Sequence, residues 1–223
     1  MNLLNKRCFA SWSGGKDSCL ALYKAIKLGY EPIKLLTMFS KENGISSAHR
    51  LDESILTAQA NAIEIEGIIG RAEFDDYENV FVSHLKSFKE QGIDYGIFGD
   101  IDLEEHRQWE EKVCEKAAIT AVLPLWNINR KDIVKEFINC GFKAKIVVVN
   151  TTALSTEFLG KDLSLSLIDE LERAGADVCG ENGEYHTVVY DGPIFKRPIK
   201  LNFGSEAISV GEKWAHIKVN TTE

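Results

Sequence analysis

RCFASWSGGKDS, at residues 7–18, is the stretch around which the rest of the chain is organised. A short, largely apolar run opens into two adjacent glycines, and a periodic stretch with Leu22, Ile26 and Leu28 follows. This pattern predicts a strand, a tight loop and the N-terminus of a helix. Such a loop directs several backbone N–H groups and the positive end of the helix dipole at one point in space.

The side chains of the loop favour an anionic ligand. Gly14 and Gly15 let the backbone approach an anion without a Cβ in the way. Lys16 adds a cation, Ser13 and Ser18 add hydroxyls, and Asp17 would hold Mg²⁺ or orient the amides. We therefore expect a polyphosphate site, the alternative being an ordinary glycine-rich turn with a surface lysine.

Two common phosphate-binding motifs are excluded. A Walker A loop would need Gly at position 10 and Ser or Thr at position 17, where this chain has Ala10 and Asp17. The GxGxxG of a dinucleotide fold is also absent. The string SGGKDS resembles the pyrophosphate loop of the ATP pyrophosphatases, in the adenine nucleotide alpha hydrolase superfamily. That resemblance implies cleavage of ATP between the α and β phosphates.

Composition limits the partners. The chain of 223 residues has 34 acidic and 26 basic residues and a formal charge of −8, which argues against a broad nucleic-acid surface. Residues 1–7 hold no apolar run of signal-peptide length, and no stretch approaches a membrane span, so a cytoplasmic protein without membrane contact is expected. The five cysteines form no CxxC pair and are expected to be buried, reduced thiols.

Strand and helix patterns alternate along the first half of the chain. Expected strands at 33–39, 68–72, 93–100 and 121–126 are separated by expected helices at 52–63, 77–90 and 103–118. This predicts an α/β fold with a Rossmann-like, five-stranded, mostly parallel sheet. Ligands bind beyond the carboxyl ends of such strands, so residues 13–18, Met38, Gly99–Asp100 and Trp126 are expected to converge.

After Trp126 the pattern changes. A helix to Cys140, a β-branched strand at 144–150, a helix at 164–174 and then short strands predict a smaller α+β region. We expect an ATP-binding pyrophosphate-loop domain at 1–125 and an α+β acceptor-binding domain at 126–223.

A second polar cluster lies in the C-terminal region. Glu181, Glu184, His186, Thr187 and Asp191 crowd around Gly180 and Gly183, which favours a site over a solvated hairpin. Strand alternation would put Glu184 and His186 on one face, where the carboxylate would orient the imidazole as a general base. The ordinary pKa of His186 would suit it to accept a proton from an attacking ammonium.

With both clusters in view, the chain resembles the diphthine–ammonia ligase family over nearly its whole length. The resemblance rests on SGGKDS at 13–18, His49, FGDI at 98–101, LPLW at 123–126, GENGEYHT at 180–187 and DGPIF at 191–195. The first string is shared by the superfamily, whereas FGDI and GENGEYHT are specific to this family.

The resemblance implies an amide-forming ligase that uses ATP and Mg²⁺. ATP would adenylate the carboxylate of diphthine on elongation factor 2, or of a related acceptor, and ammonia would displace AMP. The catalytic residues would be Lys16, Asp100, Glu181, Glu184 and His186, with Asp17 and Asp100 as metal ligands and the Thr37–Met38 backbone reading adenine. The implied nucleotide-binding residues are Ser11, Ser13, Gly14, Gly15, Lys16, Asp17, Ser18, Thr37, Met38, His49, Gly99 and Trp126.

Two rival functions stay open. A tRNA-modifying enzyme on the same ATP domain is disfavoured by the missing CxxC pair and the acidic balance. A nucleotide-binding sensor without turnover would need the loop but not an acid–base cluster. The sequence shows no glutaminase-type nucleophile, so ammonia would be free or delivered by a partner. It is silent on oligomeric state, and a homo-oligomer is compatible with it.

Overall fold

The computed structural model describes residues 6–41 and 49–222. The chain divides into two compact units. Of the described residues, the first unit comprises 6–13, 17–41 and 64–127, and the second comprises 14–16, 49–63 and 128–222. The tip of the glycine-rich loop is thus grouped with the C-terminal part of the chain rather than with the strand that precedes it.

A five-stranded parallel sheet forms the first unit. Its strands are β1 (Lys6–Ser11), β2 (Tyr30–Ser40), β3 (Glu66–Ala72), β4 (Tyr95–Ile97) and β5 (Thr120–Val122), in the order β3-β2-β1-β4-β5. The predicted Rossmann-like α/β fold is confirmed. The order of strands reverses between β1 and β4, which is where open sheets of this kind bind ligands.

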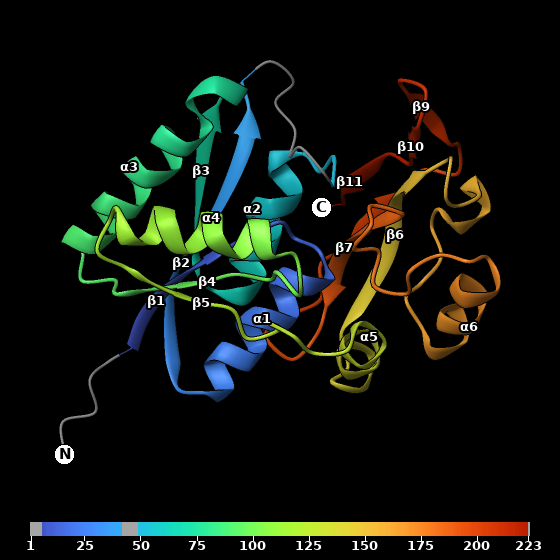
Figure 1. The fold of residues 1–223 in the computed structure, drawn as a ribbon. Helices are drawn as coiled ribbons and strands as arrows, with labels where there is room; N and C mark the ends of the chain where they lie inside the picture. The colour runs from blue at the N-terminus through green and yellow to red at the C-terminus, as the bar shows by residue number, and fades with distance from the viewer. Residues whose placement is uncertain (1–5, 42–48, 223) are drawn as a thin grey trace. The chain divides into compact units, whose positions relative to one another are not determined.

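Helices α3 (Tyr77–Glu90) and α4 (Glu104–Glu115) cover one face of this sheet (Figure 1). Phe9 of β1 and Leu36 of β2 pack there against Phe81 and Leu85 of α3 and Val113 of α4. Helix α1 (Lys16–Lys27) follows the loop, and the short 3₁₀ helix η1 (Phe74–Asp76) precedes α3. The core is therefore aromatic and aliphatic directly below the loop-bearing end of β1.

The last strand is shorter than the sequence pattern indicates. β5 ends at Val122, whereas an extended segment to Trp126 was expected. Pro124 has no N–H to give to a neighbouring strand, and Trp126 N donates to Leu123 O in a turn. The prediction that Trp126 ends a strand is therefore wrong.

The second unit is built on a four-stranded antiparallel sheet in the order β7-β6-β10-β9. Its strands are β6 (Lys143–Asn150), β7 (Tyr185–Asp191), β9 (Ile208–Val210) and β10 (Trp214–His216), and β8 (Leu201–Phe203) pairs with β11 (Val219–Thr221). The helices are α2 (Glu53–Ile63), α5 (Arg130–Asn139) and α6 (Leu165–Arg173), with the 3₁₀ helix η2 (Thr156–Phe158). The smaller α+β region is confirmed.

Side-chain caps explain where two of these helices begin. The Asn129 carboxamide oxygen accepts from the backbone N–H groups of Lys131 and Asp132, and the Ser164 hydroxyl accepts from Leu167 N–H. These caps satisfy donors that a helix start leaves unpaired.

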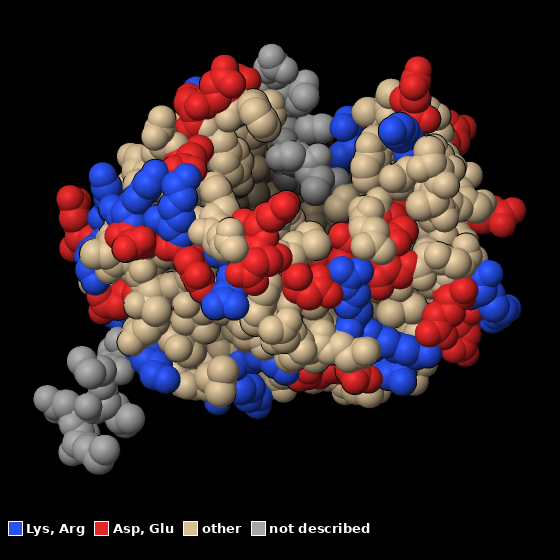
Figure 2. Space-filling view, in the orientation of Figure 1, with Lys and Arg blue, Asp and Glu red and all other residues tan. Residues whose placement is uncertain are grey.

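Among the described residues, no helix is both long and apolar enough to cross a membrane. The signal-peptide argument rests on residues 1–7, of which 1–5 lie outside the described residues. On the face drawn in Figure 2, basic and acidic side chains are interspersed, so this face presents no broad basic surface.

Candidate functional site

In the second unit, the tip of the glycine-rich loop is bound to strand β7. Val189 N–H donates to the Gly14 carbonyl at 3.0 Å, and Lys16 N–H donates to the Thr187 hydroxyl at 3.1 Å. The Lys16 ammonium lies 5.5 Å from the centre of the Tyr185 ring, and this lysine is only 5% exposed. The loop tip is thus held by a strand that lies 171 residues further along the chain at the Lys16–Thr187 contact.

Gln59 of α2 completes this support. Its amide nitrogen donates to the carbonyls of Gly14 at 2.9 Å and Val189 at 2.7 Å, and the residue is fully buried. Gly14 has a φ of +78°, and a Cβ there would lie 2.6 Å from the Gln59 side-chain oxygen. Only glycine combines this left-handed backbone with so close an approach.

The substitution Gln59→Leu is expected to lower the free energy of unfolding by about 2 kcal/mol, because it leaves the buried Val189 carbonyl without its side-chain donor. Urea unfolding monitored by circular dichroism measures this. The exposed Gln108 on α4 bonds only to the Glu104 side chain, so Gln108→Leu serves as the control and should change stability by less than about 0.5 kcal/mol. Equal effects of the two changes would contradict the bridging role of Gln59.

Two histidines lie beside the loop in the second unit. His49 Nδ1 bonds to the Thr187 carbonyl oxygen at 2.8 Å, and the His49 and His186 rings lie 4.9 Å apart. The His186 ring also stacks with the Trp214 ring, with the two ring centres 5.9 Å apart. Burial, followed by the charges of His49 and Lys16, lowers the pKa of His186 to about 3. The expectation that His186 keeps a pKa suited to deprotonating ammonium is therefore wrong, because desolvation disfavours the imidazolium.

This lowered pKa predicts an acid-sensitive stability. The unfolded chain binds a proton at His186 below about pH 6.5, while the folded protein does not until about pH 3, so stability falls as pH drops through that window. Between pH 7 and pH 5, wild type is expected to lose about 2 kcal/mol more than His186→Asn, whose side chain does not titrate. Urea unfolding at the two pH values tests this. Parallel losses in both proteins would show that His186 does not contribute to the loss.

Glu184 holds its own loop rather than the imidazole. Its Oε1 accepts from Asp177 N–H at 3.0 Å and from the Asn182 amide at 3.1 Å. The carboxylate of Asp177 in turn accepts from Arg130 at 2.6 Å and from Glu181 N–H at 3.1 Å. Among the described residues, the expected Glu184–His186 pair does not form. Glu184 Oε2 is buried without a partner there, so one carboxylate oxygen still lacks a donor.

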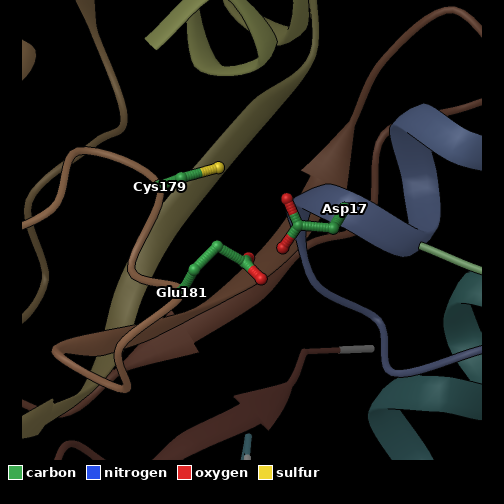
Figure 3. Close-up of side chains that lie close together, drawn as sticks. All are labelled: Asp17, Cys179 and Glu181. Carbon is green, nitrogen blue, oxygen red and sulfur yellow. The ribbon is translucent and has the colours of Figure 1, made fainter. Parts of the chain in front are cut away.

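Figure 3 shows where the acidic residues of the two clusters lie in the chain. Cys179 and Glu181 lie on the loop before β7 in the second unit, whereas Asp17 stands in the first turn of α1 in the first unit. All five cysteines are free thiols, as expected, but Cys140 is partly exposed rather than buried. Burial and then the charge of Asp17 raise the pKa of Cys19, so the start of α1 does not activate this thiol.

From Asp17 onward, helix α1 belongs to the first unit. The hydroxyls of Ser13 and Ser18 lie 3.2 Å apart across the loop. A Cβ on Gly99 would lie 3.0 Å from the Asp17 carbonyl carbon and the Ser18 nitrogen. Because Gly99 has no side chain, the segment after β4 can contact the start of α1. The sequence predicted that the segments following β1 and β4 would meet.

In the first unit, residues of β2 hold Trp12, which follows β1 directly. The Thr37 hydroxyl donates to the Trp12 carbonyl at 2.7 Å, and Trp12 N–H donates to the Leu36 carbonyl at 2.8 Å. The Met38 side chain belongs to the hydrophobic core of this unit. The expectation that Thr37 and Met38 read adenine through their backbone stays a prediction, because neither side chain is available for it.

Asp100 follows the carboxyl end of β4 and has two titratable neighbours, His106 and Glu110. His106 Nδ1 lies 2.7 Å from Asp100 Oδ1. Glu110 of α4 is 4% exposed, and burial followed by the nearby Asp100 raises its pKa to about 11. Sequence reasoning missed both His106 and Glu110. One signal was available in the sequence. Glu110 follows Trp109 and stands three residues before Val113, which places it on the apolar face of the helix.

Trp126 lies in the turn after β5, against helix α4. Arg107 of α4 lies over its ring at 5.1 Å, and the neighbouring Asn127 N–H donates to the Ile101 carbonyl at 2.8 Å. Trp126 is therefore brought beside the segment that follows β4.

Two carboxylates of the first unit, Asp17 and Asp100, are of the chemical type that Mg²⁺ prefers. Mg²⁺ usually binds through one or two carboxylates together with phosphate oxygens. Gly99, the residue before Asp100, contacts the backbone of Asp17. That these two carboxylates hold the ion stays a prediction.

Comparison with known proteins gives a consistent result. A family model described as the diphthamide synthase N-terminal domain matches residues 6–121, and one described as the diphthamide synthase C-terminal domain matches residues 129–221. The diphthine–ammonia ligase of Homo sapiens is 28% identical, covering 95% of this chain and 88% of the relative. That of Mus musculus is 30% identical, covering 91% and 85%. A solved structure described as a predicted subunit of tRNA methyltransferase from Methanocaldococcus jannaschii aligns with a TM-score of 0.45 at 16% identity, over 86% of this chain and 100% of that chain, which is too distant to bear on function.

Proposed function

Because this chain belongs to the diphthamide synthase family, we propose that it is an ATP-dependent ligase that amidates a carboxylate with ammonia and releases AMP and pyrophosphate. Relatives over most of its length are named diphthine–ammonia ligases, which supports ammonia as one substrate, and the glycine-rich loop supports ATP as the other. The acceptor in this proposal is diphthine on elongation factor 2 or a related carboxylate, which would place the reaction in the cytoplasm. We assign ATP binding to the domain at 1–125 and acceptor binding to the domain at 126–223.

One observation carries the proposal: the glycine-rich tip is bound to β7 through Gly14 and Lys16. A loop held this way presents backbone N–H groups at a helix start to the outer phosphates of ATP. An anchored loop is also preorganised, so little reorganisation energy is needed as charge develops on the departing pyrophosphate.

The reaction divides into two balanced steps. An oxygen of the acceptor carboxylate attacks the α phosphorus, and the bond to the β phosphate breaks with release of pyrophosphate. Ammonia then attacks the acyl carbon, AMP departs with the former carboxylate oxygen, and one proton leaves the nitrogen. An acyl adenylate loses AMP far more readily than a carboxylate loses oxide, so each barrier is lower than that of direct amidation.

The residues take the following roles. Lys16 and the loop amides bind the pyrophosphate, and the backbone at Thr37–Met38 binds adenine. Asp17 and Asp100 would hold Mg²⁺, which supplies charge neutralisation at the phosphates when bound. His186 is uncharged and Glu184 holds its own loop. We therefore assign to Glu181 or Asp100 the role of accepting the proton that leaves the attacking nitrogen. His186 then positions the acceptor without adding positive charge beside Lys16.

Product analysis tests the proposal. The full chain is incubated with Mg·ATP, ammonium and candidate carboxylates, and the nucleotide products are separated. AMP with pyrophosphate is expected, dependent on acceptor and ammonium. ADP with phosphate would contradict it.

A nucleotide-binding sensor is the rival of another class. Glu181→Gln and His186→Ala distinguish the two functions, because a ligase should lose at least about tenfold in turnover while still binding ATP. A sensor would bind ATP in wild type and variants alike and release no AMP. A tRNA-modifying enzyme would instead turn over only when RNA is supplied.

A further inference from the structure

A cavity of about 410 Å³ lies within the second unit. Its walls come from β6, η2, residues 159–161, β8 with the turn that follows it, and Ile217 after β10. Among the described residues, neither the glycine-rich loop nor β7 contributes to the lining. The volume lies within the range of small-molecule sites, and the proposed reaction leaves this cavity without a use.

Backbone hydrogen bonds to β6 hold two of the walls. Ile146 N–H donates to the Lys161 carbonyl at 3.0 Å, and the Ile146 carbonyl accepts from Gly160 N–H at 2.8 Å. Ile217 N–H donates to the Val147 carbonyl at 3.0 Å. A Cβ on Gly160 would come within 4 Å of only one side-chain atom, Cδ1 of Ile217 at 3.7 Å, so there is space beside this glycine. The cavity is therefore formed by the fold itself, as sites for small molecules usually are.

The charged side chains of the lining are both lysines. Among the described residues, no carboxylate, histidine or arginine lines the cavity beside Lys145 and Lys161. Lys145 Nζ donates to the Gly160 carbonyl at 3.0 Å and to Asp162 Oδ2 at 2.7 Å, and Lys161 Nζ donates to Glu170 Oε2 at 2.6 Å. An ammonium group has three N–H donors. These bonds use two of them at Lys145 and one at Lys161, so one and two remain for a ligand.

The two acids fix the ammonium groups without lining the cavity themselves. The other carboxylate oxygen of Asp162 accepts from the Tyr190 hydroxyl at 2.9 Å, which holds this acid in place. The Lys145 ammonium also lies 5.5 Å from the centre of the Phe203 ring. A side chain that is already held loses less conformational freedom when it binds a ligand. The lysines are therefore preorganised donors.

Two hydroxyls and an apolar wall complete the lining. Among the described residues, the hydroxyls of Thr156 and Ser205 make no hydrogen bond within the protein, so each can donate to a ligand. Leu159, Phe203 and Ile217 supply the apolar wall. Donors on two ammonium groups and two hydroxyls suit a phosphate monoester, which offers three terminal oxygens and up to two negative charges. Lysine is also a common ligand of phosphate, which it binds as a point charge.

We infer that this cavity binds a phosphate monoester with a small aromatic or apolar body. The phosphate is bound by Lys145 and Lys161, and the body lies against Phe203 and its apolar neighbours. A cation would meet two ammonium groups there, and a neutral molecule would leave their remaining donors without an acceptor. The inference goes beyond the proposed function and does not depend on it, because none of the residues to which that function assigns a role lines the cavity.

Phenyl phosphate is the probe, with phenol as its neutral control and benzoate as its carboxylate control. Each is titrated calorimetrically into the full chain without nucleotide. Phenyl phosphate is expected to bind at least about fivefold more tightly than either control, and at least about fivefold more weakly to Lys145→Met and Lys161→Met. Lys143→Met is the matched control, because Lys143 is an exposed lysine of the same strand, pairs with Asp191 and does not line the cavity.

A second kind of variant leaves both ion pairs intact. Ala207 lines the cavity from an exposed position, so Ala207→Phe should fill part of it and weaken phenyl phosphate by at least about fivefold without loss of an ion pair. Thermal unfolding checks that each variant is folded. Lys16→Ala separates this cavity from the glycine-rich loop, which could also bind a phosphate, and it should leave the affinity for phenyl phosphate unchanged.

Four results would overturn the inference. They are no saturable binding of phenyl phosphate at millimolar concentrations, binding of phenol or benzoate as tight as that of phenyl phosphate, unchanged affinity in all three cavity variants, and a loss of affinity in Lys16→Ala alone. The last result would assign the phosphate to the glycine-rich loop. Because no nucleotide is present, the outcome is independent of whether the protein forms AMP from ATP.

Discussion

Replacing Lys16 with alanine is expected to lower the rate of AMP and pyrophosphate release by at least about a hundredfold. Lys16 is buried in the second unit, its backbone is bound to Thr187, and its ammonium lies over the Tyr185 ring. A cation held this way is already placed for the charge that develops on the departing pyrophosphate, and removal of one such group typically costs two to three orders of magnitude in rate, about 3–4 kcal/mol.

The measurement is a steady-state assay of pyrophosphate release together with a titration of Mg·ATP. Lys27→Ala is the control, since Lys27 lies on the same helix but is exposed in its last turn. If Lys16→Ala binds and turns over ATP as wild type does, the loop does not hold the outer phosphates and the proposed function fails with it.

The substitution Gly15→Ala is expected to remove most nucleotide turnover and to destabilise the second unit by about 1–3 kcal/mol. A Cβ at this position would lie 2.2 Å from Cε1 and 2.9 Å from Nδ1 of His49. The ring cannot simply turn aside, because His49 Nδ1 is bonded to the Thr187 carbonyl oxygen. The added methyl group must therefore displace either the histidine or the loop.

A double-mutant cycle separates this clash from a general effect on the loop. In a His49→Gly background the added methyl group has room, so Gly15→Ala should cost at least about 1 kcal/mol less than in wild type. Gly204→Ala is the matched control, because a Cβ there meets its nearest atoms at ordinary contact distances of 3.4–3.5 Å. Additive effects of Gly15→Ala and His49→Gly would contradict direct contact between these two residues.

The strand, glycine-rich loop and helix start at residues 7–18 were predictable because their requirements are local. Strand, paired glycines and helix start are consecutive in the chain, so the residue types at 13–18 suffice to identify them. The parallel sheet was predictable for a related reason, since apolar periodicity and chain alternation restrict the topology to few choices.

Within the polar cluster at 181–191, the expected pairing of Glu184 with His186 is wrong. Alternation along a strand places Glu184 and His186 on one face, but β7 begins at Tyr185 and Glu184 lies in the preceding turn. Its carboxylate bonds to Asp177 N–H and the Asn182 amide, neither of which strand periodicity can indicate. The pKa of His186 was mistaken for the same reason: it depends on burial and on His49 and Lys16, residues more than 130 positions away.

By itself the sequence determined the α/β class, the position of the loop and the family, because each depends on residues close together or on strings that stand unbroken in the chain. Tertiary structure alone decided that Gln59 and Thr187 hold the loop, that His186 is uncharged, and that Glu110 is buried beside Asp100. These properties arise from desolvation and from hydrogen bonds between distant segments, and both exist only once folding has excluded water from between them.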